Sequence, residues 1–258
     1  MITEIIFSIV IPFLGTVLGS CFIFLFKKLN NTLLKAFSGF AGGVMIAASI
    51  WSLIIPSFEQ TANLGKLSFI PIIIGLWLGF AFLLLLDKVI PHAHCDGNEE
   101  GPKCNLKKST MTSLAVALHN FPEGLAVGVV LASAVSGGST VSITMAIALA
   151  IGIAVQNFPE GAIVSVSLSQ SGMSKKKACF FGILSGAVEP IGALLTFFLA
   201  SFITPALPYL LSFAAGAMIY VVIEELIPDM TKGEHSHLGS LMFFIGFSLM
   251  MILDIILG

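Results

Sequence analysis

Eight long apolar runs divide this sequence, and each is long enough to cross the hydrocarbon core of a bilayer as a helix of about 20 residues. Membrane-spanning β-strands would alternate polar and apolar residues at a period of two, which these runs do not do. A content of 57% hydrophobic and only 10% charged residues excludes an ordinary soluble domain. The sequence therefore predicts an all-α membrane protein, with one transmembrane domain over residues 1–258. The predicted helices lie at about 4–26, 33–56, 67–90, 110–135, 139–169, 178–202, 206–228 and 238–257.

The twelve basic residues, all lysines, show which side of the membrane each loop occupies. With eight predicted crossings, Lys66 falls on one side of the membrane and the other eleven lysines fall on the opposite side. The positive-inside rule assigns that lysine-rich side to the cytoplasm, so both termini are expected outside the cell membrane. The lysines assigned to the cytoplasm are Lys27, Lys28, Lys35, Lys88, Lys103, Lys107, Lys108, Lys175, Lys176, Lys177 and Lys232.

Several classes of function are disfavoured by the remaining composition. A net charge of −2 with no basic cluster disfavours nucleic-acid binding, and there is no glycine-rich Lys-Ser/Thr loop for a nucleotide. The first run has no basic segment before it and is read as a permanent helix, not a leader. The four cysteines are scattered, and Cys95, Cys104 and Cys179 lie on or near the reducing side, so structural disulfides are not expected.

A repeated phrase in two neighbouring runs carries the functional signal. His119-Asn120-Phe121-Pro122-Glu123-Gly124 is nearly copied by Gln156-Asn157-Phe158-Pro159-Glu160-Gly161. The two phrases lie at equal distances from the Gly-Gly turn between their helices, so antiparallel packing brings them to one depth near the middle of the membrane. Within each helix the polar residues are three or four positions apart and share one face. Each proline also removes a backbone hydrogen bond and frees a carbonyl oxygen.

These polar residues, with a third acid in the next run, form a set suited to a divalent cation. Glu189 also precedes a proline and is also predicted to lie deep. An ionised carboxylate at the bilayer centre costs about 2.5–3.5 kcal/mol, and no lysine or arginine lies between positions 109 and 174 or 178 and 231. A metal ion or shared protons would compensate. One imidazole with carboxylates and amides favours Zn²⁺, Fe²⁺, Mn²⁺ or Cd²⁺ over Cu⁺. The candidate ligands are His119, Asn120, Glu123, Gln156, Asn157, Glu160 and Glu189.

Structural roles compete with ligation at some of these positions. Asn120 and Asn157 would also serve as interhelical hydrogen-bonding residues, as polar side chains do in membranes. Glu189 would also serve as a protonated helix cap beside its proline. A lone intramembrane histidine is often a hydrogen-bonded core residue, but His119 lies one turn from Glu123, with a copy of the phrase opposite.

The two phrases and the following Glu-Pro helix resemble the ZIP family of divalent-metal transporters, and within it the prokaryotic GufA-like branch. The resemblance covers essentially the whole chain and implies eight helices in a 3+2+3 inverted repeat with both termini outside. It also implies a binuclear centre. One metal position matches His119, Glu123, Gln156 and Glu160, and the second matches Asn120, Glu123, Asn157, Glu160 and Glu189. Many family members carry histidine at the position of Gln156 and aspartate at that of Asn157.

The resemblance further implies a function: uptake of zinc, or of iron, manganese or cadmium, into the cytoplasm by alternating access without ATP. The metal is then a transported substrate, no cofactor is expected, and a homodimer is implied. Met45 resembles a second-helix residue near the first metal position, although core packing is the alternative.

Further candidate residues lie nearer the membrane surfaces. The cytoplasmic loop 91–108 contains His92 and His94 and either collects metal or is a solvated linker. His235 and His237, in the loop after the seventh helix, have the same two interpretations. Glu224 and Glu225 are candidates for the exit and Glu59 for the outer mouth, or they mark the membrane interface.

Two other functions use buried acids. An intramembrane metalloprotease would need two histidines on one helix face, as in His-Glu-x-x-His, and this chain has one buried histidine in the predicted spans. A proton-coupled transporter of an organic solute is the second alternative, although the site lacks a cation to hold an anionic substrate.

Overall fold

The structure is a computed structural model of the chain and describes residues 1–25, 30–93, 99–103, 108–136, 141–202 and 204–257. It is a bundle of long helices with one two-residue β pair. The helices and strands are α1 (Ile2–Cys21), η1 (Phe22–Phe24), α2 (Asn31–Ala48), η2 (Ser49–Ile54), α3 (Ile55–Gln60), η3 (Ala62–Leu67), α4 (Phe69–Val89), β1 (His92–Ala93), β2 (Glu99–Glu100), α5 (Lys108–Val135), α6 (Ile143–Gln170), α7 (Lys175–Gly186), α8 (Val188–Phe202), η4 (Thr204–Ala206), α9 (Leu207–Val221), η5 (Val222–Leu226), α10 (Ile227–Thr231) and α11 (Leu238–Leu257).

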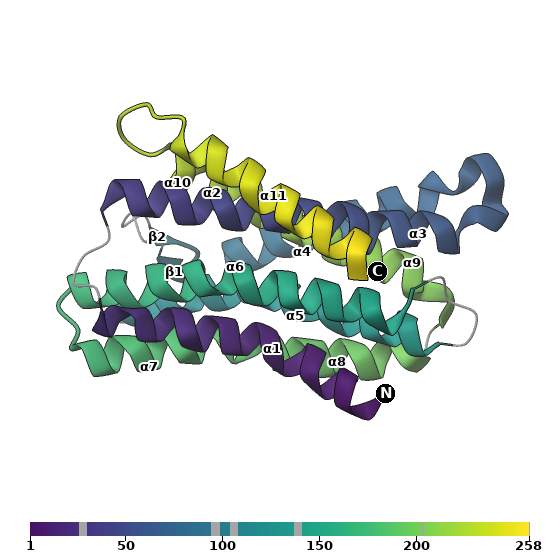
Figure 1. Cartoon of the computed structure of the whole chain (residues 1–258), viewed down its shortest axis with the longest axis horizontal. Coiled ribbons are helices and arrows are strands. Elements are labelled where there is room, and N and C mark those ends of the chain that lie inside the picture. Colours follow the sequence, from purple (N-terminus) through teal and green to yellow (C-terminus); the bar gives the residue numbers. More distant parts are fainter. Residues whose placement is uncertain (26–29, 94–98, 104–107, 137–140, 203, 258) are drawn as a thin grey trace.

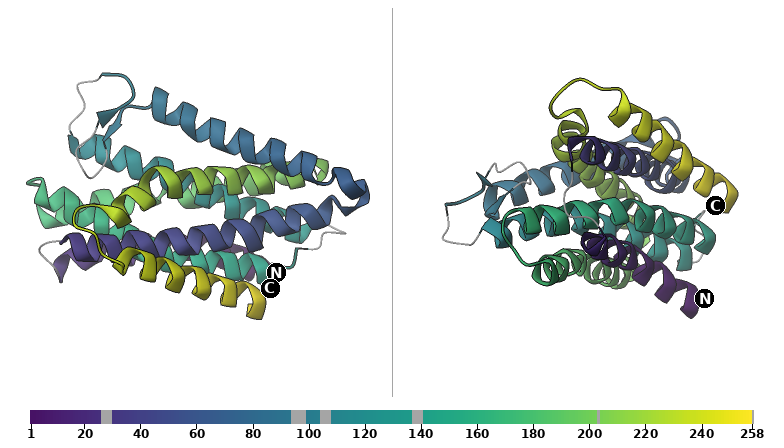
Figure 2. Two further views of the ribbon diagram at one scale, coloured as in Figure 1. Left: turned by 90° about the horizontal axis from the view of Figure 1, so that it is seen from above. Right: turned by 60° about the vertical axis from the view of Figure 1, so that its left-hand side comes forward.

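Eight helical segments of the described chain are long and apolar enough to cross a membrane, which confirms the predicted fold class. They run back and forth along the long axis of the molecule, and the two termini lie at the same end (Figure 1). The loops that follow α4 and α10, and the start of α7, lie at the other end (Figures 1 and 2). Lys103, Lys175 and Lys232 belong to these segments, and Lys88 lies in the last turn of α4 next to them. We therefore call this end the lysine-rich end.

Three of the crossing segments depart from a regular α-helix in their interior. The second runs from Asn31 to Gln60 through a π-helical stretch, η2, and continues as α3 with a proline in its first turn. The seventh contains a second π-helical stretch, η5, followed by α10. The sixth is interrupted between α7 and α8 at Ala187. Such irregular turns often occur at functional sites because they expose backbone groups and redirect side chains.

The helices form two groups, as judged by which of them pack most extensively. The first group contains α1, α5, α6, α7 and α8, with α1 against α6 and α5 against α8. The second group contains α2, α3, α4, α9, α10 and α11, with α2 against α11 and α4 against α9. The groups meet mainly where α2 and α11 lie against α6 and where α5 lies against α9.

Glycine allows backbone-to-backbone contact inside each group. A Cβ atom on Gly15 would overlap the carbonyl oxygen of Ala154 on α6, and one on Gly124 would overlap that of Glu189 on α8. In the second group, a Cβ on Gly43 would overlap the carbonyl oxygen of Phe243. Close approach through small residues is the usual way in which helices pack in a membrane, where no hydrophobic force drives their association.

The boundary between the groups is packed differently. Among the described glycines, Gly152 of α6 is the one in close contact across this boundary, and a Cβ added to it would meet the sulfur of Met250 on α11. A flexible thioether yields more readily than a backbone carbonyl. The contacts inside each group are therefore rigid, and those between the groups are adaptable.

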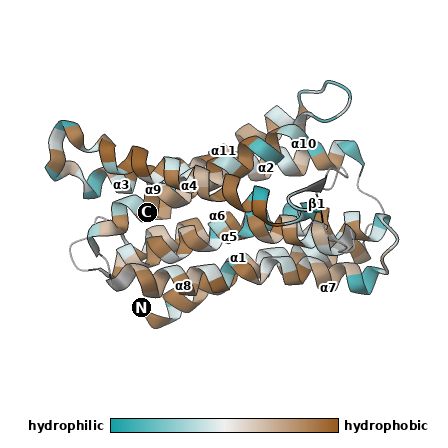
Figure 3. Cartoon of the chain, turned by 180° about the vertical axis from the view of Figure 1, so that it is seen from behind, coloured by the Kyte–Doolittle hydropathy of each residue, from teal (hydrophilic) through white to brown (hydrophobic). Residues whose placement is uncertain are grey.

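Hydrophobic residues occupy most of the length of the helices, and hydrophilic residues gather mainly towards the two ends of the bundle (Figure 3). On α4, for example, Trp77, Leu78 and Leu85 are more than half exposed. This distribution is that of a protein whose outer surface faces lipid. In the half nearer the termini, large apolar side chains fill much of the interior: Leu53, Leu131, Leu149 and Leu211 have no exposed surface. A buried polar pair lies there too, in which Ser52 donates a hydrogen bond to Asp254.

Two adjacent glycines on α2 test the role of backbone contact. We expect Gly43→Ala to lower the stability of the protein by about 1–3 kcal/mol, because the new methyl group overlaps the backbone of α11. Gly42→Ala is the matched control, since its Cβ would lie 3.5 Å from Leu226 and Phe243, an ordinary contact. Thermal unfolding in detergent micelles measures both variants. Equal unfolding temperatures would contradict the proposed packing.

Candidate metal centre

The two copies of the repeated phrase meet inside the bundle, on α5 and α6. The Gln156 Nε2 atom donates a hydrogen bond of 2.6 Å to Glu123 Oε1. Both side chains are buried, with exposed fractions of 0% and 1%. The proline of each phrase lies inside its helix, Pro122 in α5 and Pro159 in α6. The equal depth that the sequence predicts for the two phrases is therefore confirmed at this pair.

Glu189, in the first turn of α8, is the centre of a second set of hydrogen bonds. Its Oε2 accepts from Asn157 Nδ2 at 2.8 Å, and its Oε1 accepts from Asn120 Nδ2 at 3.2 Å. The Thr16 hydroxyl of α1 donates to the same Oε1 at 2.7 Å. Glu189 is 1% exposed. Four helices thus meet at one carboxyl group, and the hydrogen-bond donors described for it are two amides and one hydroxyl, all of them neutral.

Oxygen atoms without hydrogen-bond donors gather at the same place. Glu123 Oε2, Asn120 Oδ1, Gln156 Oε1 and Asn157 Oδ1 are all buried, and none accepts a hydrogen bond from the described residues. Leaving a buried acceptor unsatisfied costs about 1–3 kcal/mol each. No three His, Cys, Asp or Glu side chains of the described structure close around one point on their own. The oxygen-rich set, amides included, is nevertheless a suitable environment for a hard or borderline cation.

A cavity lies beside this set at the boundary between the two helix groups. Its volume is about 60 Å³, enough for a few waters. His119 and Glu160 line it from the first group, and Glu225 and Asp229 from the second. His119 Nδ1 lies 2.7 Å from Glu225 Oε2. Because α10 and the start of α2 also line it, the cavity extends towards the lysine-rich end.

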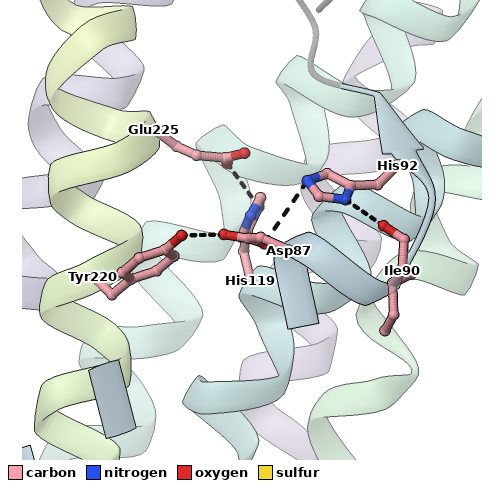
Figure 4. Close-up of polar contacts among 6 residues, drawn as sticks. All are labelled: Asp87, Ile90, His92, His119, Tyr220 and Glu225. Atoms are coloured by element: carbon pink, nitrogen blue, oxygen red, sulfur yellow. Dashed lines mark hydrogen bonds and ion pairs between the residues drawn. The ribbon is translucent and has the colours of Figure 1, made fainter. Parts of the chain in front are cut away.

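A second polar cluster lies close to the His119–Glu225 pair (Figure 4). Tyr220 of α9 donates a hydrogen bond to Asp87 Oδ2 near the end of α4. His92 of β1 lies 3.8 Å from Asp87 Oδ1 through its Nε2, and its Nδ1 is 2.8 Å from the Ile90 carbonyl oxygen. His92 has no exposed surface, so this part of loop 91–108 is packed and is not a solvated linker.

The remaining candidates are spread over the molecule. Met45 is fully buried in the apolar core, while Glu59 and Glu224 are exposed. His235 and His237 are exposed, with ring centroids 4.9 Å apart. His94 lies outside the described residues. The loop that carries His235 is fixed to α2, because Lys35 donates to the Glu234 carbonyl oxygen and lies 3.4 Å from Ser236 Oγ.

Some residues of the site could not be identified from the sequence alone. Thr16 reaches Glu189 from α1, and its signal was a single hydroxyl in an apolar run between Gly15 and Gly19. Asp87 and Tyr220 come from distant helices, and nothing in their spacing indicates that they pair.

The comparisons with known proteins agree with this geometry. Residues 107–254 match the family model described as ZIP Zinc transporter. The chain is 35% identical to Zinc transporter ZIP11 of Xenopus tropicalis, over 94% of each chain. It is 36% identical to Zinc transporter GufA of Myxococcus xanthus over 81% of each, and 34% identical to Zinc transporter ZIPB of Bordetella bronchiseptica over 95% of this chain and 79% of the relative.

The chain belongs to the ZIP family. The match covers more than half of the sequence and includes both copies of the repeated phrase and Glu189. It confirms the resemblance seen in those motifs, including the similarity to prokaryotic members. As a ZIP protein the chain is a multi-pass membrane transporter of divalent metal and not an enzyme, which removes the metalloprotease alternative. Zinc is a transported substrate, not a cofactor.

The two tyrosines of the chain allow a controlled test of the Asp87 cluster. We expect Tyr220→Phe to lower stability by about 1–3 kcal/mol, because it leaves a buried carboxylate oxygen without its donor. Tyr209→Phe is the control, since Tyr209 is 37% exposed. Thermal unfolding of both variants in the same detergent is the measurement. A loss of the same size in both would show that the Tyr220 hydroxyl has no special role.

Proposed function

We propose that this ZIP protein moves Zn²⁺ into the cytoplasm through a site at the middle of the membrane, formed by α5, α6 and α8. The observation that carries the proposal is the set of four buried acceptor oxygens that receive no hydrogen bond from the described residues. They lie next to carboxyl groups whose described donors are neutral amides and one hydroxyl. A divalent cation supplies the positive charge and the coordination that these oxygens lack.

The site holds two ions in this proposal. The first binds His119, Glu123, Gln156 and Glu160, and the second binds Asn120, Glu123, Asn157, Glu160 and Glu189. The hydrogen bonds support this division, because Gln156 bonds Glu123 whereas Asn120 and Asn157 both bond Glu189. The two glutamates of the repeated phrases bridge the ions.

The cavity gives the ion a path towards the lysine-rich end. His119 and Glu160 line its deep part together with Glu225, and Asp229 lies one turn beyond Glu225. An ion released from the centre therefore meets further oxygen ligands in the direction of the cytoplasm. In the opposite half, fully buried leucines fill much of the core of the described structure. This supports a state that is open to the lysine-rich end and closed to the other.

Alternating access follows from the two kinds of packing. The first group carries the site residues and is held together by backbone contacts at glycines, so it moves as a unit. The boundary with the second group consists of side-chain contacts and the His119–Glu225 pair. Sliding of one group against the other exposes the site to each side in turn without ATP.

The lysine-rich end faces the cytoplasm of the cell, and both termini face outwards. The exposed apolar surface contacts lipid, and part of it contacts a second copy of the chain in a homodimer. In this proposal the eight membrane-spanning helices are arranged as a 3+2+3 inverted repeat.

Conservative variants of the bridging acids test the site. We expect Glu123→Gln and Glu160→Gln to abolish uptake of radiolabelled zinc into liposomes, because each removes a negative charge that the ion requires. Glu4→Gln in α1 is the control, since Glu4 pairs with the chain terminus, far from the site. Uptake at the wild-type rate by Glu123→Gln would refute the assignment.

Thermal stabilisation tests whether the metal binds at the proposed site. A ligand at about 100 times its dissociation constant stabilises the folded state by about 2.7 kcal/mol. We therefore expect saturating Zn²⁺ to raise the unfolding temperature of the wild-type protein and to have a smaller effect on Glu123→Gln. The same rise in both proteins would place the binding elsewhere, and no rise in either would show that Zn²⁺ does not bind the folded protein in detergent.

A further inference from the structure

Two cysteines from distant parts of the sequence meet at the lysine-rich end of the first helix group. The Cys21 Sγ atom at the end of α1 lies 3.8 Å from the Cys179 Sγ atom of α7. Both are free thiols, of which Cys21 is exposed and Cys179 is buried. We propose that this pair is a dithiol site for a thiophilic divalent cation, Zn²⁺ or Cd²⁺, distinct from the central site.

The separation of the two sulfurs suits this chemistry. Two thiolates bound to one tetrahedral zinc, each at about 2.3 Å, lie about 3.8 Å apart. The pair therefore already has the spacing that the ion requires. A disulfide would instead need a sulfur–sulfur distance of about 2.05 Å, and the thiols lie at the end that the lysines assign to the reducing cytoplasm.

The surrounding contacts hold the two helices at this spacing. Lys175, one turn before Cys179 on α7, donates a hydrogen bond of 2.9 Å to the Ile23 carbonyl oxygen, two residues beyond Cys21. Close by, a Cβ on Gly182 of α7 would contact Ser20 of α1. Because these contacts restrict movement of α1 against α7, the ion meets a prearranged pair and little ordering opposes binding.

The described residues supply two ligands at this site, so the bound ion is exchangeable. A structural zinc site is closed by four protein ligands. Here each thiol releases one proton and donates an electron pair from its sulfur, no oxidation occurs, and water fills the remaining positions. An apolar cluster surrounds Cys179 and includes Val164, which also lines the central cavity. The dithiol site thus lies behind one wall of the cavity.

Cadmium titration of the whole protein tests the proposal. Cys95 and Cys104 are first replaced by serine, leaving Cys21 and Cys179 as the thiols of the chain. The protein is kept in detergent with a phosphine reductant. We expect Cd²⁺ to produce the ultraviolet charge-transfer band of cadmium thiolates and to slow labelling of Cys21 by a maleimide. Adding Cys21→Ser or Cys179→Ser to this background should remove most of the band.

The outcomes distinguish this site from the central one. Glu123→Gln in the same background should keep the full band, whether or not it transports zinc. A band that survives Cys179→Ser unchanged would overturn the proposal. So would the absence of a band in the background protein when a thiol assay on the unfolded chain counts two reduced cysteines, or a disulfide that persists in the reductant.

Discussion

The rest of the structure depends on keeping three carboxyl groups in the interior of a membrane bundle with no lysine or arginine of the described structure beside them. Glu123 and Glu189 are almost fully buried and accept hydrogen bonds from amides and one hydroxyl. Neutral donors lower the cost of burying a charge but do not cancel it. The helices that carry these donors must therefore stay in register, and the glycine contacts provide that register. For example, Gly124 of α5, the residue after Glu123, lets the backbone of α5 approach the backbone of Glu189 on α8.

The same contacts explain how one chain combines a fixed site with a movable boundary. Backbone packing at glycines fixes α1 to α6 and α5 to α8, and these helices carry every donor to Glu123 and Glu189. The partners across the boundary, such as Met250 and Glu225, are long side chains that adopt other rotamers at little cost. Relative movement of the groups then changes access to the site and leaves the ligand geometry intact.

The fold was largely predictable, because lipid imposes a length and a composition on every crossing segment. The meeting of the two phrases followed from their equal distance to one turn. Contacts between distant helices were not predictable: Thr16 on Glu189, Tyr220 on Asp87 and Cys21 on Cys179 depend on helix rotation, which the sequence does not state. The burial of His92 was missed for a similar reason, since a loop rich in polar residues gives no sign of packing against α5.

The amides of the site connect its hydrogen bonds with the proposed function. Gln156 and Asn157 each give their nitrogen to a carboxylate and leave their oxygen without a donor. The terminal torsion of an amide is two-fold and soft, so a rotation of about 180° exchanges nitrogen and oxygen. Under the proposed function, a cation that binds Glu123 and Glu189 displaces these donors, and rotation turns the amide oxygens into ligands. A carboxylate in place of Gln156 or Asn157 could not donate a hydrogen bond to Glu123 or Glu189 when the ion is absent. Its added charge would also raise the cost of burying the unloaded site. Amides therefore suit a site that must be stable both before the ion arrives and after it leaves.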